Sequence, residues 1–80
     1  MAMDHAILRE HLALVEQHIR DGERHIGRQR QLIAELQRSG HDSSTAQDLL
    51  RSYEQSQSLH IAKRDRMRQE LAGHKSHTLP

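Results

Sequence analysis

Hydrophobic residues in the first half of the chain recur at alternating steps of four and three positions. The repeat runs without a break from Leu8 to Leu36 and fills the a and d positions of a coiled coil. Only Gly22 and Gln29 interrupt its apolar character. A helix with one apolar stripe is stable only when the stripe is covered. The pattern therefore predicts a long helix over residues 4–39 that packs against another helix.

The second half of the chain carries a weaker repeat with the same spacing, from Ala46 to Leu71. Three of its positions are strongly polar, namely Gln57, His60 and Arg64. The matching period nevertheless predicts a second helix whose inner stripe faces the first. We refer to the two facing stripes together as the seam.

A concentrated turn signal separates the two repeats, over residues 40–45. Gly40 suits the left-handed position that follows a helix, and Asp42 or Ser43 suits the N-cap of the next helix. Asp4 is expected to cap the first helix in the same way, with its carboxylate on the free amides of the first turn. An alternative start for the second helix is a capping box that begins at Ser44 or Thr45.

These signals predict a loop over residues 40–42, a second helix over 43–72 that Gly73 ends, and a flexible tail over 73–80. A loop this short forces its two helices to lie antiparallel. The expected fold is all-α: a single domain over residues 1–80, built as an antiparallel two-helix coiled-coil hairpin.

Folding the chain about residues 41–42 predicts which side chains meet across the seam. The expected neighbours are Ile33 and Leu50, Ile26 and Gln57, Gly22 with His60 and Ile61, and Leu12 and Leu71. Glycine inside a helix costs about 1 kcal/mol relative to alanine, so we expect Gly22 to make room for His60 or Ile61. Because the polar positions of both repeats meet halfway along, the seam should be strong at both ends and weak at its centre.

Leu49 and Leu59 widen the apolar face of the second helix, and the first helix carries apolar residues outside the seam, Ile7 and Leu14. Burial along one thin seam barely offsets an ordering entropy of about 1.5 kcal/mol per residue, so this outer stripe favours self-association. We predict a homodimer, or a higher oligomer, that closes into a four-helix bundle, with a larger protein partner as a further option. The residues expected to carry the interaction are Ile7, Leu8, Leu12, Leu14, Val15, Ile19, Ile26, Ile33, Leu36, Leu50, Tyr53, His60, Met67 and Leu71.

Composition narrows the functional classes. The chain has 80 residues, of which 34% are hydrophobic and 29% are charged. Tyr53 is the single residue of the Phe, Trp and Tyr types in the sequence. Twelve basic and eleven acidic residues leave a net charge of +1, which points to neither a membrane surface nor an acidic partner. Cysteine is absent, which excludes disulfides and thiol chemistry. No run is apolar enough for a leader or a membrane span, so we expect a cytoplasmic protein.

Histidines recur every seven residues along one edge of the first helix's stripe, at His11, His18 and His25. Residues at this spacing lie about 10 Å apart along a helix, too far to share one metal ion, and no pair has the i, i+4 spacing of helical zinc sites. The sequence therefore predicts no metal site and no cofactor, with a pH-responsive edge as the alternative. Near the open end of the hairpin, a loose metal-binding cluster is a further alternative for His5, His74 and His77.

The densest basic stretch is residues 63–68, and the first helix adds Arg20, Arg24, Arg28 and Arg30. Acidic residues interleave with these cations at i, i+3 and i, i+4 spacing, as on a solvated helix face. Binding of nucleic acid through both basic faces is the alternative function, although no aromatic platform is present for base stacking.

No glycine-rich phosphate loop, nucleophile motif or cysteine is present, and the carboxylates fall on outward positions. The sequence predicts that the protein is not an enzyme. It is expected to be a small interaction or structural module that acts through helical faces.

Three segments together resemble a group of short alphaproteobacterial proteins of unknown function. They are residues 23–30 (ERHIGRQR), the turn at 40–42 leading to Leu49 and Leu50, and the stretch from His60 to Arg66. The resemblance covers most of residues 15–71 and consists of a pattern of charges and heptads. It implies a helical hairpin and supplies no catalytic residue.

Overall fold

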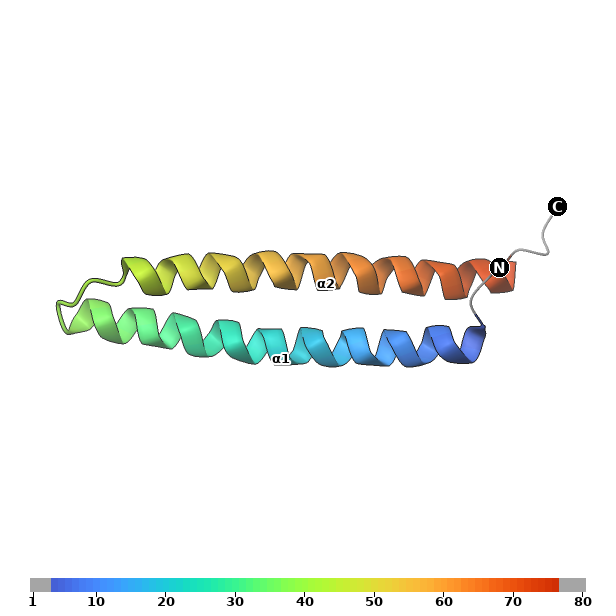
Figure 1. Cartoon of the computed structure of the whole chain (residues 1–80), viewed down its shortest axis with the longest axis horizontal. Coiled ribbons are helices and arrows are strands. Elements are labelled where there is room, and N and C mark those ends of the chain that lie inside the picture. The colour runs from blue at the N-terminus through green and yellow to red at the C-terminus, as the bar shows by residue number, and fades with distance from the viewer. Residues whose placement is uncertain (1–3, 77–80) are drawn as a thin grey trace.

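A computed structural model of the chain describes residues 4–76 and places two long helices side by side (Figure 1). Helix α1 spans His5–Arg38, and helix α2 spans Ser44–Ser76. They run antiparallel along their whole length and form a rod with extents of 63 × 21 × 18 Å. The predicted all-α hairpin is confirmed. Within the described range, neither helix holds a stretch long and apolar enough to cross a membrane.

Apolar packing is concentrated toward the open end of the hairpin. Leu8, Val15, Ile19 and Met67 form one buried cluster, with Leu12, Ile61 and Leu71 packed against it. Toward the turn, the buried positions of α1 are Gln29 and Ile33. The expectation of a strong seam at both ends is therefore wrong for the turn end, because polar side chains share the buried positions there.

The two helices meet about one helical turn away from the predicted register. Gln57 of α2, rather than His60 or Ile61, occupies the space over Gly22. In the observed register the Gln57 side-chain amide nitrogen donates to a backbone carbonyl of α1, which offsets part of the cost of burying it.

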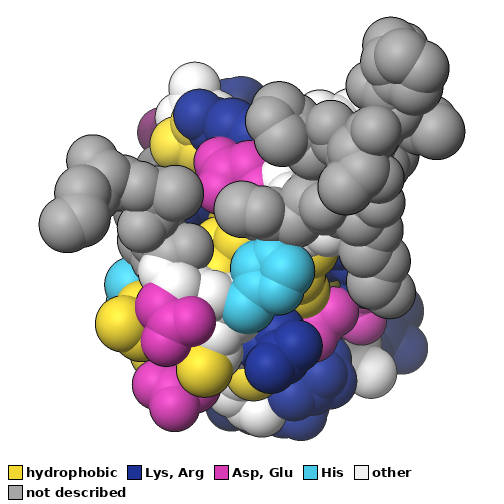
Figure 2. Space-filling view, turned by 90° about the vertical axis from the view of Figure 1, so that its right-hand side faces the viewer, with side chains coloured by type: hydrophobic (Ala, Val, Ile, Leu, Met, Phe, Trp, Pro, Cys, Tyr) yellow, Lys and Arg dark blue, Asp and Glu magenta, His cyan; other side chains and the backbone are white. Residues whose placement is uncertain are grey.

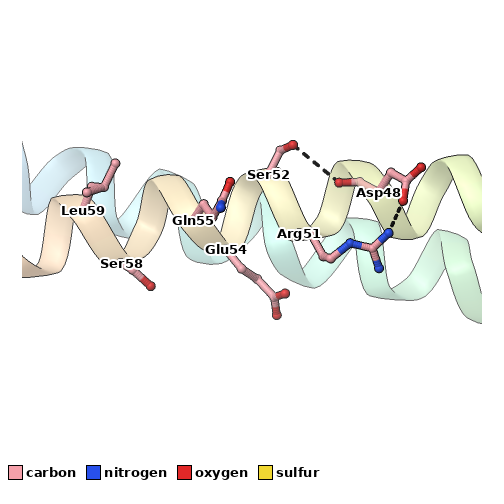
Figure 3. Close-up of a pocket in the computed structure, with 7 residues that line it drawn as sticks. All are labelled: Asp48, Arg51, Ser52, Glu54, Gln55, Ser58 and Leu59. Carbon is pink, nitrogen blue, oxygen red and sulfur yellow. Dashed lines mark hydrogen bonds and ion pairs between the residues drawn. The ribbon is translucent and has the colours of Figure 1, made fainter.

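Charged side chains lie on the surface of both helices. Seen from the open end, Lys, Arg, Asp and Glu side chains lie beside hydrophobic ones and a histidine (Figure 2). Within single helices, Arg24 pairs with Asp21, and Arg51 pairs with Asp48 (Figure 3). Both pairs have i, i+3 spacing, and such exposed pairs add a few tenths of a kcal/mol each to helix stability.

The turn begins with a well-formed helix end. Gly40 has a φ of +73°, the left-handed conformation predicted for it. The amide of His41 donates to the carbonyl of Leu36 at 2.8 Å, and that of Gly40 donates to the carbonyl of Gln37 at 3.2 Å. These two bonds define a Schellman motif, which satisfies carbonyls that the end of α1 leaves open.

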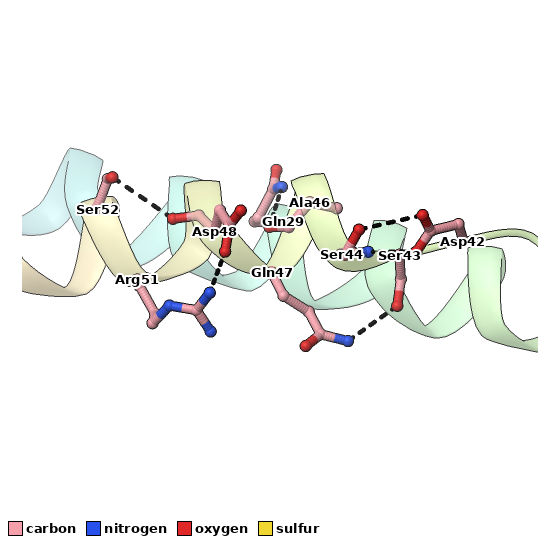
Figure 4. Close-up of polar contacts among 9 residues, drawn as sticks. All are labelled: Gln29, Asp42, Ser43, Ser44, Ala46, Gln47, Asp48, Arg51 and Ser52. Carbon is pink, nitrogen blue, oxygen red and sulfur yellow. Dashed lines mark hydrogen bonds and ion pairs between the residues drawn. The ribbon is translucent and has the colours of Figure 1, made fainter.

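Helix α2 starts with a cap provided by Asp42, one of the two residues predicted for that role. Its Oδ1 accepts a hydrogen bond from the Ser44 amide at 2.9 Å, and Oδ2 contacts the Ser44 hydroxyl at 3.1 Å (Figure 4). Ser43 is buried and its Oγ accepts from Gln47 Nε2 at 2.9 Å. The connection between the two helices spans residues 39–43. The hydrogen bonds from Ser44 hold the pKa of Asp42 below its usual value, and the bond from the backbone amide has the larger effect.

Two predicted helix ends differ from the structure. Asp4 precedes α1 but makes no side-chain capping bond; only its carbonyl accepts, from the Leu8 amide at 2.9 Å. Helix α2 does not end at Ala72 but continues to Ser76. Gly73 keeps an ordinary helical backbone, since Gly40 has the only positive φ among the described glycines. Glycine permits a helix end without requiring one. The predicted flexible tail over 73–80 is therefore wrong for residues 73–76, which belong to α2, and residues 77–80 lie outside the described residues.

Replacing Asp42 by alanine should lower the melting temperature most at neutral pH. The pKa of this carboxyl is lower in the folded state than in the unfolded one, so its stabilisation is present above about pH 4 and is lost as pH falls through the folded pKa. Circular-dichroism melts of wild type and Asp42→Ala should differ at pH 7 and converge near pH 2.5. A difference that is the same at both pH values would contradict the proposed cap.

Candidate interaction surface

A buried amide joins the two helices at the centre of the hairpin. Gln57 is 8% exposed, and its Nε2 donates to the backbone carbonyl of Ile19 at 2.9 Å. Its Oε1 lies where a side chain at Gly22 would begin, and a Cβ there would also come within 2.9 Å of the Gln57 Cδ. This buried oxygen meets no hydrogen-bond donor among the described residues, and it occupies a space that only glycine leaves open.

The same arrangement occurs a second time nearer the turn, with the helices exchanging roles. Gln29 of α1 is 9% exposed, and its Nε2 donates to the carbonyl of Ala46 in α2 at 2.9 Å (Figure 4). Each amide thus reaches the backbone of the opposite helix at one particular place. Unlike apolar contacts, which tolerate sliding, these two bonds define the register of the hairpin.

Histidines of α1 meet aromatic rings of α2 on one side of this polar centre. The rings of His18 and His60 lie with their centroids 5.3 Å apart and their planes at 44°. His25 and Tyr53 meet edge to face, with centroids 5.8 Å apart. Both pairs line a surface groove of about 280 Å³, together with Asp21, Gly22, Ser56 and Gln57. We call this side of the hairpin the histidine flank.

The opposite side of the seam is bridged by ion pairs between the helices, beside a shallow depression of about 240 Å³ lined by Glu16, Ile19, Arg20, Glu23, Arg64 and Arg68. Arg68 Nη2 lies 3.0 Å from Glu16 Oε2, and Arg30 Nη2 lies 3.2 Å from Glu54 Oε2. We call this side the ion-pair flank. Long charged side chains cover apolar surface with their stems while their charged ends reach water. The two sides of the seam therefore differ, because only this one is bridged by interhelical charge pairs among the described residues.

Exposed apolar side chains accompany the histidine flank. Ile7 and Leu14, four residues before His11 and His18 respectively, are 45% and 59% exposed. Leu32 lies two turns after His25, and Leu49 lies two turns before Ser56, which lines the groove. Leu59, at 71% exposed, stands at the outer edge of this surface on α2. The histidine flank is thus a groove with apolar side chains toward each end.

The structure places the predicted seam residues on the inner faces. Buried or half-buried are Leu8, Leu12, Val15, Ile19, Ile26, Ile33, Leu36, Leu50, Tyr53, His60, Met67 and Leu71. Sequence reasoning identified the outer stripe of α1 at Ile7 and Leu14 and the wider apolar face of α2 at Leu49 and Leu59, and all four side chains are exposed. It missed Leu32, although Leu32 follows the histidine edge of α1 at the same seven-residue spacing.

Half of the side chains on the predicted basic faces pair with carboxylates. Four of the arginines that would contact nucleic acid, Arg24, Arg30, Arg64 and Arg68, each lie against a carboxylate. Arg20 contacts Gln17. Lys and Arg side chains bind nucleic acid by displacing salt cations from its phosphates. Arginines that already pair with carboxylates do this less readily, so these ion pairs weaken the case for nucleic-acid binding.

The described residues contain no enclosed reaction site. A depression runs along the outward face of α2, and all the residues that line it come from that helix alone (Figure 3). No three His, Asp, Glu or Cys side chains within the described range gather closely enough to hold a metal ion. The side chains of His74 and His77, considered above for a terminal cluster with His5, lie outside the described residues.

No family model, curated protein or solved structure matches this chain. The resemblance to short alphaproteobacterial proteins therefore stays a prediction. The feature of the molecule that supports a function is the histidine flank.

Substituting Gly22 by alanine should destabilise the hairpin by about 1 kcal/mol, even though alanine is the better helix former. The new methyl group would displace the Gln57 side chain and break its hydrogen bond to the Ile19 carbonyl. Thermal and urea unfolding followed by circular dichroism measures the change.

Gly27 provides the matched control, because it lies in the same helix with open space around its Cα. Gly27→Ala should stabilise the protein by up to about 1 kcal/mol. In a Gln57→Ala background, Gly22→Ala should become stabilising as well. Two alanine substitutions that both stabilise the otherwise wild-type protein would show that Gln57 does not hold the register.

Proposed function

We propose that the protein is a non-enzymatic interaction module that pairs with a second copy of itself through the histidine flank. The observation that carries the proposal is the row of exposed apolar side chains on that flank. The paired product would be a four-helix bundle, in which each groove is covered by the other hairpin. A solvated surface would place charge at these positions, as the ion-pair flank does.

The solvent-accessible surface of the chain is large enough for a second copy to pack against it. The chain has 6283 Å² of accessible surface, whereas a folded monomer of 9.3 kDa is expected to expose about 5000 Å². A standard interface covers about 800 Å² on each partner. A second copy packed along one flank of the rod would therefore remove most of the excess.

Symmetry supports a second copy rather than an unrelated helix. A two-fold axis perpendicular to the rod would bring the open end of one hairpin against the turn end of the other. Ile7 and Leu14 of one copy would then face Leu32 and Leu49 of its partner, and the two histidine-lined centres would meet. With a net charge of +1 per chain, repulsion between the copies is small.

Leu14→Glu should convert the dimer into a monomer. The new carboxylate would stand on the proposed interface, where it would lose hydration without gaining a charged partner, a cost of several kcal/mol. Sedimentation velocity of wild type and variant at equal concentrations measures the change in mass.

The control is Ala13→Glu, which adds the same charge one residue away, at an exposed position on the other side of the stripe. This variant should sediment as a dimer. A monomeric wild type, or a dimer that Leu14→Glu leaves unchanged, would contradict the proposed interface.

A further inference from the structure

Three of the described histidines line the groove of the histidine flank, and pairing of two copies by itself assigns them no role. His18 and His25 lie on α1 and are exposed, whereas His60 lies on α2 and is half-buried. A histidine side chain in water takes up a proton near pH 6.5. The charge of this groove therefore changes between pH 8 and pH 5, while the ion pairs of the opposite flank keep theirs.

The carboxylate in the groove is already paired. Among the described residues that line the groove, only Asp21 carries a carboxylate. It lies between His18 and His25 along α1, but it accepts hydrogen bonds from Gln17 and Arg24. Apart from the histidines, the other lining side chains are uncharged near neutral pH. A protonated histidine in the groove therefore gains no free carboxylate partner.

The charged groups beside the groove do not offset this shortage. Arg28 lies about one turn after His25 on α1, and Lys63 lies about one turn after His60 on α2. Farther toward the open end, the charged or titratable residues that line a second depression are His11, Lys63, Arg66 and Glu70. Each of the two depressions thus has fewer carboxylates than basic side chains. Protonated histidines would add to a positive surface.

Two of the three groove histidines lie against each other across the seam. The ring centroids of His18 and His60 are 5.3 Å apart, and the planes of the rings are at 44°. Two protonated rings at this distance repel each other, and the repulsion is strongest where water is excluded. In a single hairpin the groove opens to solvent, which screens these charges. A partner packed over the groove would remove that water.

The groove lies where a two-fold dimer brings the two copies together. It extends along α1 from His18 to His25, and the midpoint of His5–Arg38 falls between these two residues. When two hairpins overlap fully about a two-fold axis, the groove of one copy therefore faces the groove of the other. Three histidines from each copy, six in all, would then lie in one contact.

We infer that the histidine flank makes the pairing of two copies depend on pH: the dimer forms while His18, His25 and His60 are neutral and separates when they are protonated. The inference rests on the proposed function, because it concerns the same interface. Covered histidines without carboxylate partners favour the neutral form, so the separated hairpins bind protons more tightly than the dimer does. The dimer is therefore most stable above about pH 7.5 and weakens as pH falls through about 6.5.

The test is sedimentation equilibrium of the wild type at pH 7.5 and pH 5.5 at equal ionic strength. Each histidine that must stay neutral in the dimer raises the Kd about tenfold between these pH values. One such histidine on each chain raises it about a hundredfold, which is the smallest increase that we expect. Far-UV circular dichroism at pH 5.5 should show that the separated hairpin stays helical.

Glutamine variants identify the groups that respond to pH, since glutamine is polar and does not titrate. In the triple variant His18→Gln/His25→Gln/His60→Gln, the Kd should change by less than about threefold over the same pH range. His18→Gln alone, at an exposed position, should already reduce the increase at least about threefold. His41→Gln is the matched control, because His41 is exposed in the turn and does not line the groove. It should keep the pH dependence of the wild type.

The outcomes separate this inference from the proposed function. A dimer with the same Kd at both pH values, or a triple variant that responds to pH as the wild type does, would overturn the pH dependence and leave the dimer in place. Loss of the helical signal at pH 5.5 would also overturn it, because the histidines would then act on the hairpin rather than on the interface. A chain that is monomeric at both pH values would overturn both proposals.

Discussion

The alignment of the two helices depends on the hydrogen bond made by one buried side-chain amide, that of Gln57. Gln57 sits in the middle of a seam with few large apolar residues, where an unpaired amide would cost several kcal/mol. The Ile19 carbonyl accepts a hydrogen bond from Gln57 Nε2, and Gly22 leaves the space that Gln57 Oε1 occupies. The hydrogen bond and the space over Gly22 together favour one alignment of two helices that apolar contacts alone would allow to slide.

The two sides of the hairpin differ as a consequence of that alignment. It brings Glu16 and Arg30 within reach of basic and acidic partners on α2, and these ion pairs cover one side. On the other side it places His18 opposite His60 and His25 opposite Tyr53. Exposed leucines and an isoleucine flank these rings in place of charge pairs. One side of the hairpin is thus bridged by ion pairs, and the other is apolar and lined by rings. This difference favours association through the second side.

The fold followed from the sequence because the 3-4 spacing and the turn residues are local signals. Gly40 adopts the left-handed conformation predicted for it, and Asp42 caps α2. The register did not follow, because it depends on a pairing between Gln57 and Gly22 that are far apart in the chain, and spacing within one helix carries no information about the other. The His18–His60 pair was missed for the same reason. Gly73 shows the opposite case, a local signal that the longer helix overrides.

The most direct test of this account is the nuclear Overhauser effect between the Gly22 Hα protons and the side chains of α2. The uniformly labelled protein should show cross-peaks from Gly22 Hα to the Gln57 side-chain protons. It should also show the Gln57 amide protons shielded from solvent exchange. Cross-peaks from Gly22 Hα to the His60 ring or the Ile61 methyl groups instead would place the helices one turn away. The asymmetry between the two flanks, and the site built on it, would then be wrong.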